Sequence, residues 1–200
     1  MKYILFLLLV ILAQNTLGQR RVYKVGDVAF CGIVFFVEED TMGNQRGLVC
    51  APLDQHVGIR WYKDSFITTF AHLDHPYAKN NSDMIIRAQG TDDYAATVCR
   101  KYRPADTLCT NWYLPTRIEL ILMYSNIANS KDAAIRAKGK FKREGYWSSL
   151  ELKPDSTTGF TPNQRNAFIV DFFNGRNFPV NKANKYRVRA VREFQNPRRG

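Results

Sequence analysis

Positively charged side chains stand at every second position near the C-terminus, in the stretch KYRVRAV. If this stretch is a β-strand, its period of two sends Lys185, Arg187 and Arg189 to one face and the residues between them to the other. Cations spaced about 7 Å apart match the repeat of an anionic polymer such as a sulfated glycan. A solvated sheet face would show the same pattern, so the row alone leaves both interpretations open.

A second group of cations lies in the segment RAKGKFKRE and supports the same chemistry. Exposed aromatic rings can add to it by stacking on sugars, and we expect them in the irregular region around residue 61. Trp112 and Trp147 are expected in the core instead. The candidate ligand contacts are therefore Lys138, Lys140, Lys142, Arg143, Lys185, Arg187, Arg189, Trp61 and Tyr62.

Residues that could catalyse a reaction or bind a metal follow no recognised pattern. No nucleophile-elbow, Walker or HExxH motif occurs in the sequence. HLDHP brings His72 and His75 close to Asp74, but the spacing places no third ligand, so these are interpreted as polar loop residues. The carboxylates at 38–40 and 92–93 are explained by a turn and a helix N-terminus. We predict no catalytic residue, no metal site and no cofactor.

The first residues have the pattern of a secretory signal peptide. Lys2 precedes an apolar run over 3–13, and Thr16 and Gly18 stand at the −3 and −1 positions of a cleavage site before Gln19. A run this short does not span a bilayer, which takes about 20 residues. We predict a signal peptide over 1–18, with an uncleaved anchor as the weaker alternative. The protein is then secreted or at the cell surface, without a transmembrane segment after cleavage.

Residues 19–200 suit one domain with a sizeable core, which we place at about 23–194. The formal net charge of +11 becomes +10 when Lys2 leaves with the signal peptide. A basic exported protein meets anionic polysaccharides, lipid headgroups or cell-wall polymers, although the charge can also serve solubility alone. Nucleic acid is not predicted as a partner, because export and disulfides argue against its compartment.

Four cysteines in an exported chain favour two disulfides, for which three sets of pairings exist. Cys31 and Cys50 flank two β-like runs, so a hairpin would bring them opposite one another. Cys99 and Cys109 would close a short loop after a helix. We predict the pairs 31–50 and 99–109 as structural crosslinks, because the spacings fit neither a redox CxxC motif nor a zinc site.

The N-terminal half mixes clear signals with a region that has none. β-branched and aromatic residues predict a hairpin that begins at Val25 and whose second strand stops at Pro52. Residues 53–90 show no sustained period and are predicted to form a long, partly ordered loop. Thr91 is expected to cap a helix over 92–102, which has aspartates in its first turn and cations in its last.

The C-terminal half reads as two helix signals followed by strands. Thr116 and Glu119 form a capping box, and a second short helix is predicted between Ser130 and Gly139. The predicted strands are 145–151, a hairpin over 166–181 with a type I′ turn at Asn174–Gly175, and a last strand over 185–194. The order predicts an α+β domain with two main helices segregated from antiparallel sheets.

These motifs, taken in order, resemble one known family. YKVGDVAFCGIVFFVEED and RGLVCAPLDQ are followed by NWYLPTRIELILMY, YWSSLE, NAFIVDFFNGR and YRVRAVREF. The series resembles the C-terminal domain family of the Legionella collagen-like adhesin, a bacterial family of unknown function, over about residues 23–194. The resemblance implies a C-type-lectin-like fold with adjacent terminal strands and two helices beside the sheets. It also implies extracellular placement and, from the adhesin, binding of sulfated glycosaminoglycans by a basic surface, in a family whose members generally have no assigned catalytic activity.

The chain departs from this family in ways that bear on assembly and ligand. It has no collagen-like Gly-x-y repeat ahead of the domain. The resemblance implies a trimer for the adhesin, but without that repeat the sequence leaves open whether this chain forms a homo-oligomer. Cys31 and Cys50 stand where the family is expected to have small residues, which suggests an added crosslink. The chain also lacks the EPN, QPD and WND signatures of calcium-dependent lectins.

We therefore expect a secreted or surface-associated, adhesin-like binding module that is not an enzyme and recognises anionic, sulfated glycans through a basic surface. The alternative is a structural or protein-interaction domain of the cell surface with no glycan ligand. A third hypothesis is an enzyme, since the formylglycine-generating oxidases share the broad fold, but that chemistry needs a reactive cysteine pair.

Overall fold

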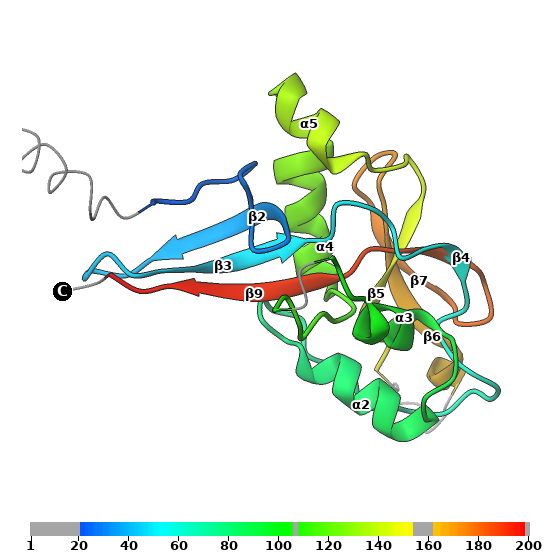
Figure 1. Cartoon of the computed structure of the whole chain (residues 1–200). Coiled ribbons are helices and arrows are strands. Elements are labelled where there is room, and N and C mark those ends of the chain that lie inside the picture. The colour runs from blue at the N-terminus through cyan, green and yellow to red at the C-terminus, as the bar shows by residue number, and fades with distance from the viewer. Residues whose placement is uncertain (1–20, 106–107, 154–161, 199–200) are drawn as a thin grey trace, which may run out of the picture.

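The chain folds as an α+β domain in which helices flank two sheets (Figure 1). The computed structural model describes residues 21–105, 108–153 and 162–198. The predicted signal peptide at 1–18 lies outside these residues. The α+β class is confirmed, although the described residues form four α-helices rather than two main ones.

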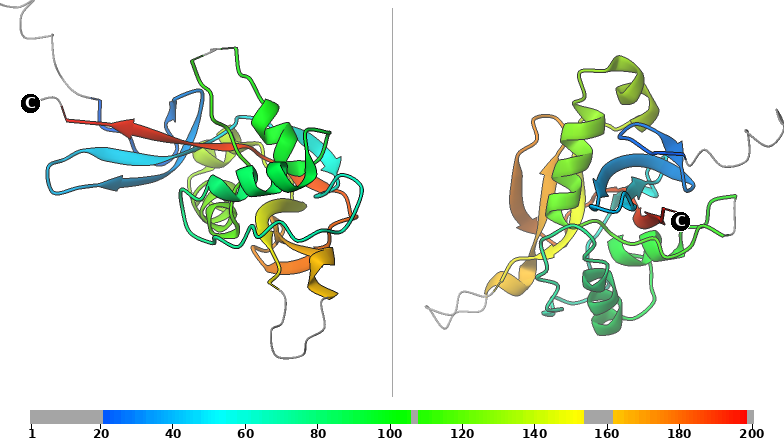
Figure 2. Two further views of the ribbon diagram at one scale, coloured as in Figure 1. Left: turned by 90° about the horizontal axis from the view of Figure 1, so that it is seen from below. Right: turned by 90° about the vertical axis from the view of Figure 1, so that its left-hand side faces the viewer.

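The first sheet has the order β1-β2-β3-β9, and all of its neighbouring strands are antiparallel. Its strands are β1 Val28–Ala29, β2 Gly32–Glu39, β3 Gln45–Cys50 and β9 Val191–Asn196. β2, β3 and β9 extend together as an arm that leaves the helical part of the molecule (Figures 1 and 2). The predicted N-terminal hairpin is confirmed, and the last strand of the chain pairs with it along its whole length.

The second sheet has the order β4-β8-β5-β6-β7. Its strands are β4 His56–Ile59, β5 Gly145–Glu151, β6 Asn166–Asp171, β7 Asn177–Asn181 and β8 Tyr186–Val188. β5 and β8 are parallel, whereas the other neighbours are antiparallel. The single last strand predicted over 185–194 is wrong, because the chain passes from the second sheet to the first through the buried residues Arg189 and Ala190.

Two helices confirm their sequence signals. α4 Arg117–Met123 begins with the predicted capping box, in which Glu119 N donates to Thr116 Oγ1 at 3.1 Å and Thr116 N donates to Glu119 Oε2 at 2.8 Å. It continues into a π-helical turn, Tyr124–Ala128. α5 Ala133–Gly139 begins after Asp132, whose carboxylate accepts from Ala134 N at 2.8 Å.

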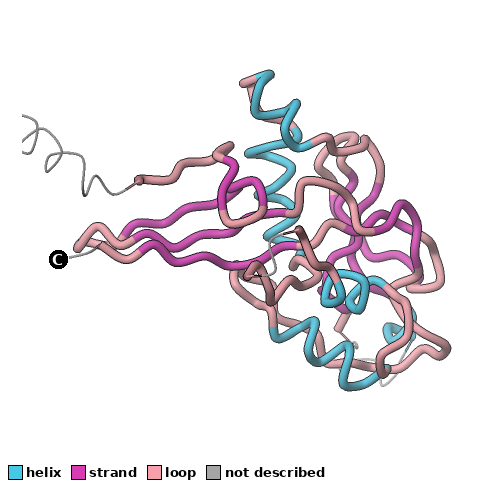
Figure 3. Tube along the Cα trace, in the orientation of Figure 1, coloured by secondary structure: helices cyan, strands magenta, loops and turns pink. Residues whose placement is uncertain are grey.

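The region predicted as a long loop is more regular than expected. It contains β4 and a whole helix, α2 Asn80–Gln89, and the irregular part lies between them (Figure 3). α2 has a weak apolar pattern because polar side chains occupy its buried face: Asn81 Nδ2 donates to Leu73 O at 2.7 Å, and Leu114 N donates to Ser82 Oγ at 2.9 Å. α3 Ala95–Lys101 also begins later than predicted, with Tyr94 rather than Thr91 at its N-cap.

One disulfide joins Cys31 to Cys109, so both predicted pairings are wrong. Phe30 and Cys31 form a tight turn between β1 and β2, both with positive φ, and this turn places Cys31 outside the β2–β3 ladder. Cys50 lies opposite Ile33 in that ladder, with its side chain in the core. Cys99 faces the other part of the core from α3. Both thiols are free and buried, and burial raises the pKa of each.

The β6–β7 hairpin turns where predicted, but the turn is not of type I′. Only Gly175 has a positive φ, of 77°, and Gly175 N donates to Asp171 O at 2.7 Å. The loop is therefore longer than two residues, with Asp171 N donating to Arg176 O at 2.8 Å across its base. A Cβ added at Gly175 would overlap the ring of Tyr124, so the turn also packs closely against the end of α4.

Replacing Gly175 with alanine is expected to lower the free energy of unfolding by about 1–2 kcal/mol, through the positive φ and the contact with Tyr124. Gly90→Ala is a matched control, because Gly90 has a φ of 84° but nothing within 4 Å of an added Cβ. Urea unfolding measures both variants. An equal loss in the two would show that the Tyr124 contact contributes nothing.

Candidate anion-binding surface

A basic segment, defined here as residues 131–143, projects with α5 from one end of the molecule (Figures 1 and 2). All of its cations are exposed: Lys131, Arg136, Lys138, Lys140, Lys142 and Arg143. Within the described parts of the chain, none of them forms an ion pair with a carboxylate. The positive charge of this segment is therefore directed at solvent.

Helix α5 holds the first half of the basic segment. Its N-terminus uses the carboxylate of Asp132 as a cap, which removes the one acidic group in the segment from competition for the cations. Its cations lie toward its C-terminus, where they also interact favourably with the helix dipole. Gly139 is buried against Ile127 and Phe141, and Lys140 then takes a left-handed conformation that ends the helix. Lys138 Nζ donates to Gly26 O at 2.8 Å.

The second half of the basic segment is a loop held on both sides. Lys142 N donates to the hydroxyl of Tyr146 at 3.0 Å, and Phe172 N donates to Glu144 O at 3.0 Å. The Glu144 carboxylate accepts two hydrogen bonds of 2.9 Å from Arg187, which lower the pKa of Glu144. Because Glu144 is already paired, it leaves the neighbouring Lys142 and Arg143 available to a ligand.

The β6–β7 turn adds two residues that the sequence analysis did not select. Phe173 and Arg176 are both exposed, and the guanidinium of Arg143 lies 4.4 Å from the centre of the Phe173 ring. The turn and the loop after α5 lie side by side, joined by the hydrogen bond from Phe172 N to Glu144 O (Figure 1). The Asn-Gly turn signal located this hairpin, but the sequence carried no signal that its tip would meet the basic segment.

The predicted row of cations at 185–189 does not form an exposed stripe. Lys185 is exposed, but the side chain of Arg187 is only 13% exposed and pairs with Asp54 and Glu144. Arg189 is buried: its Nε donates to Asp54 Oδ1 at 2.7 Å. Its Nη1 donates to two backbone carbonyl groups, and its guanidinium lies 4.0 Å from the Phe141 ring. Arg189 therefore contacts Gly139 and Phe141 of the basic segment, and Arg187 contacts Glu144 next to it. Neither arginine presents its charge to solvent.

The two aromatic candidates are also in the interior. Trp61 is fully buried and donates from Nε1 to Ser148 O at 2.8 Å. Tyr62 is 8% exposed and its ring stacks on Phe66 with 4.8 Å between centres. Neither ring is available to stack on a sugar. Trp112 and Trp147 are buried, as predicted.

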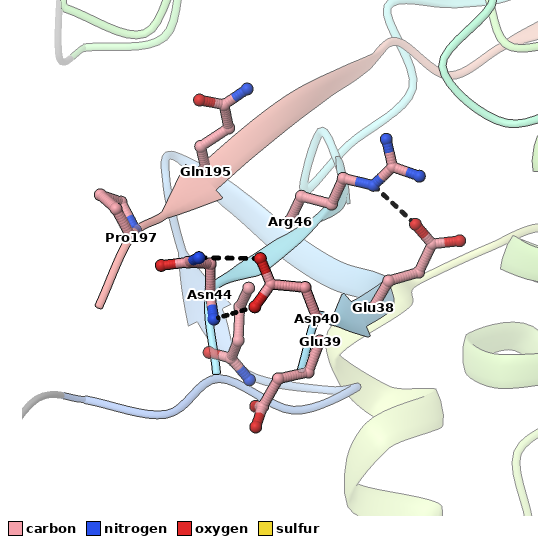
Figure 4. A pocket seen from close by; sticks show the side chains of 8 residues that line it. Glu38, Glu39, Asp40, Asn44, Arg46, Gln195 and Pro197 are labelled. Atoms are coloured by element: carbon pink, nitrogen blue, oxygen red, sulfur yellow. Dashed lines mark hydrogen bonds and ion pairs between the residues drawn. The ribbon is translucent and has the colours of Figure 1, made fainter. Parts of the chain in front are cut away.

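Two hollows of the described residues have no residue of the basic segment in their lining. One, of about 690 Å³, is at the tip of the arm and is lined by Glu38, Glu39, Asp40, Asn44, Gln45, Arg46, Gln195 and Pro197. Figure 4 shows Glu38 pointing to Arg46 and Asp40 bonded to Asn44, so two of its carboxylates hold the hairpin together. A second, of about 700 Å³, lies between the β3–β4 loop and the end of α3.

Asp74, His72 and Glu119 lie next to other side chains of the fold. Asp74 of HLDHP pairs with Arg117, and His72 Nε2 lies 3.8 Å from a buried carboxylate oxygen of Glu151. Glu119 is buried, which raises its pKa to about 7, and it accepts hydrogen bonds from Tyr77 N and the Tyr113 hydroxyl. In the part of the chain that the structure describes, no group of three or more His, Cys, Asp or Glu is placed to hold a metal ion.

Comparison with protein-family models finds no matching family, and comparison with curated proteins finds no match. Among the described residues, no helix is long and apolar enough to cross a membrane.

Proposed function

We propose that this chain is an exported, non-catalytic binding domain that recognises anionic, sulfated polysaccharides through its basic segment. The observation that carries this proposal is the exposure of all six cations of the segment without a carboxylate partner in the described residues. A flexible polyanion can lie along such a surface and exchange its counterions for lysine and arginine side chains. No enclosed pocket is needed for this type of binding.

The path of the chain supports a C-type-lectin-like fold for the domain, which we include in the proposal. The N-terminal hairpin and the C-terminal strand β9 are antiparallel neighbours, and helices lie beside the sheets. The resemblance to the adhesin family implies this arrangement. The single disulfide from the N-terminal turn to Cys109 suits an extracellular domain.

The surroundings of the ionisable groups support binding rather than catalysis. Glu119 caps a helix, Asp54 holds two arginines, and Glu151 pairs with Lys182 inside the fold. Each of these carboxylates thus has a role in the fold. The free thiols are buried with raised pKa values, which does not favour a reactive thiolate.

Replacing Lys140 and Lys142 together with glutamate is expected to weaken binding to heparin by about tenfold or more. The slope of the logarithm of the binding constant against the logarithm of the salt concentration is expected to become shallower by about 2. Neither side chain is used by the fold in the described residues, and both are exposed. Isothermal titration with heparin at several salt concentrations measures both effects.

The matched control is Lys79→Glu with Arg87→Glu, which makes the same change in net charge on the exposed side of α2. This control is expected to keep most of the affinity. If the two double variants lose affinity equally, binding reflects bulk charge and the basic segment is not the site. If the wild-type protein does not bind heparin but retains a protein partner in pull-downs, the interaction-domain alternative replaces the proposal.

A further inference from the structure

Phe173 is an exposed aromatic residue in a turn that is held by hydrogen bonds. It is 58% exposed at the tip of the β6–β7 hairpin, while the preceding Phe172 is buried in the core. Exposing a phenylalanine leaves apolar surface in water, which opposes solubility, and the ring of Phe173 is covered on one side by the guanidinium of Arg143. The exposed part of this ring is therefore accessible to a ligand.

The backbone around Phe173 is fixed from several sides. Phe173 N donates to Asp171 Oδ1 at 2.9 Å, and Arg176 N donates to Asn174 Oδ1 at 2.9 Å. Gly175 packs against Tyr124, and Phe172 N is bonded to the loop after α5. Ordering this residue on binding therefore costs little conformational entropy.

The cations beside Phe173 define what the ring can bind. Arg143 lies 4.4 Å from its centre, Lys142 is next in the chain to Arg143, and Arg176 belongs to the same turn. An apolar ring face next to several cations matches a ligand that has both apolar C–H groups and anionic groups at short spacing. Sulfated pyranose rings carry both, because the flat face of the ring is lined by C–H bonds and the sulfates stand at its edge.

We infer that Phe173 is a specificity-determining residue that stacks on a sugar ring while Lys142, Arg143 and Arg176 bind its sulfates. The ligand is then a sulfated polysaccharide rather than any linear polyanion. This inference rests on the proposed function, since it concerns the same surface. The ring of Phe173 then determines which ligand is preferred, and the cations contribute most of the affinity.

The test compares three substitutions against two polymers. Phe173→Leu keeps apolar bulk without a ring, Phe173→Tyr keeps the ring, and Phe178→Leu changes another exposed phenylalanine on the same hairpin, 42% exposed. Heparin is the sulfated polysaccharide, and inorganic polyphosphate is a polyanion without sugar rings. Phe173→Leu is expected to weaken heparin binding by about tenfold and polyphosphate binding by less than about twofold, as for other ring-stacking contacts. Phe173→Tyr and Phe178→Leu are expected to match the wild type with both polymers.

Each alternative outcome has a distinct meaning. If Lys140→Glu with Lys142→Glu weakens heparin binding but Phe173→Leu does not, the proposed function stands and the inference is wrong. If Phe173→Leu weakens the binding of both polymers equally, the ring only positions Arg143, and the inference is again overturned.

Binding to vesicles that contain phosphatidylserine is measured as well. A loss of vesicle binding in Phe173→Tyr, with heparin binding unchanged in all variants, would assign the ring to a lipid surface instead. If the double charge reversal has no effect on heparin, the proposed function itself fails.

Discussion

Lys182→Met is expected to destabilise the folded domain by about 3–5 kcal/mol, because it leaves the carboxylate of Glu151 buried without its cation. Both side chains are 1% exposed and form an ion pair. Lys182 Nζ also donates to Ile67 O at 3.1 Å and lies 4.4 Å from the centre of the Trp61 ring. The pair thus joins strand β5, the residue after β7 and the irregular loop around residue 67.

Urea unfolding followed by tryptophan fluorescence measures this loss. Lys185→Met is the matched control, since Lys185 lies three residues further along and is exposed, and its effect is expected to stay within about 0.5 kcal/mol. The double variant Lys182→Met with Glu151→Gln is expected to recover part of the stability, because a neutral amide can still accept from Thr69 N and Phe70 N. A single-variant loss below about 1 kcal/mol would show that the pair is not buried in solution.

Removing the disulfide with Cys31→Ala and Cys109→Ala is expected to cost about 4 kcal/mol. The crosslink joins residues 78 positions apart and so strongly restricts the unfolded chain. It also connects the β1–β2 turn to the segment before Trp112, whose Nε1 donates to Cys109 O at 2.9 Å. The loss is measured as the difference in unfolding free energy between the variant and the oxidised wild type. Adding reductant to the wild type is expected to produce a similar loss.

Peptide mapping of the unreduced protein tests the pairing itself. A crosslinked fragment containing Cys31 and Cys109 is expected, together with Cys50 and Cys99 that are alkylated only after unfolding, because both thiols are buried. A fragment linking Cys31 to Cys50 would restore the pairing that the hairpin pattern predicts and would contradict the structure. Cys50→Ala with Cys99→Ala serves as the control that leaves the crosslink intact.

Local signals predicted the elements whose energy comes from nearby residues. The capping box of Thr116 and Glu119, the short helix after Asp132 and strand β5 all form where the sequence indicates. α2 was missed because Asn81 and Ser82 are buried there through bonds to Leu73 and Leu114, and an apolar period does not reveal such partners. Apolar periodicity thus predicts a helix only where the buried face of that helix is apolar.

The predicted ligand contacts show the same difference between local and long-range information. The sequence predicts Lys138, Lys140, Lys142 and Arg143 as ligand contacts because their segment is dense in cations, and the structure places all four at the surface. The row at 185–189 was misplaced because alternation predicts one face only for a continuous strand. Arg189 instead lies in the crossing between two sheets, where it binds Asp54 across 135 positions of sequence.

The sequence by itself determined the α+β class, the positions of several helices and strands, and the presence of a dense basic segment. These follow from short-range capping, periodicity and charge, which depend on neighbouring residues. The tertiary structure alone decided which cysteines pair, which arginines are buried and that Phe173 meets Arg143. Those outcomes depend on contacts between distant segments. Their free energies come from burial and desolvation, which local pattern does not encode.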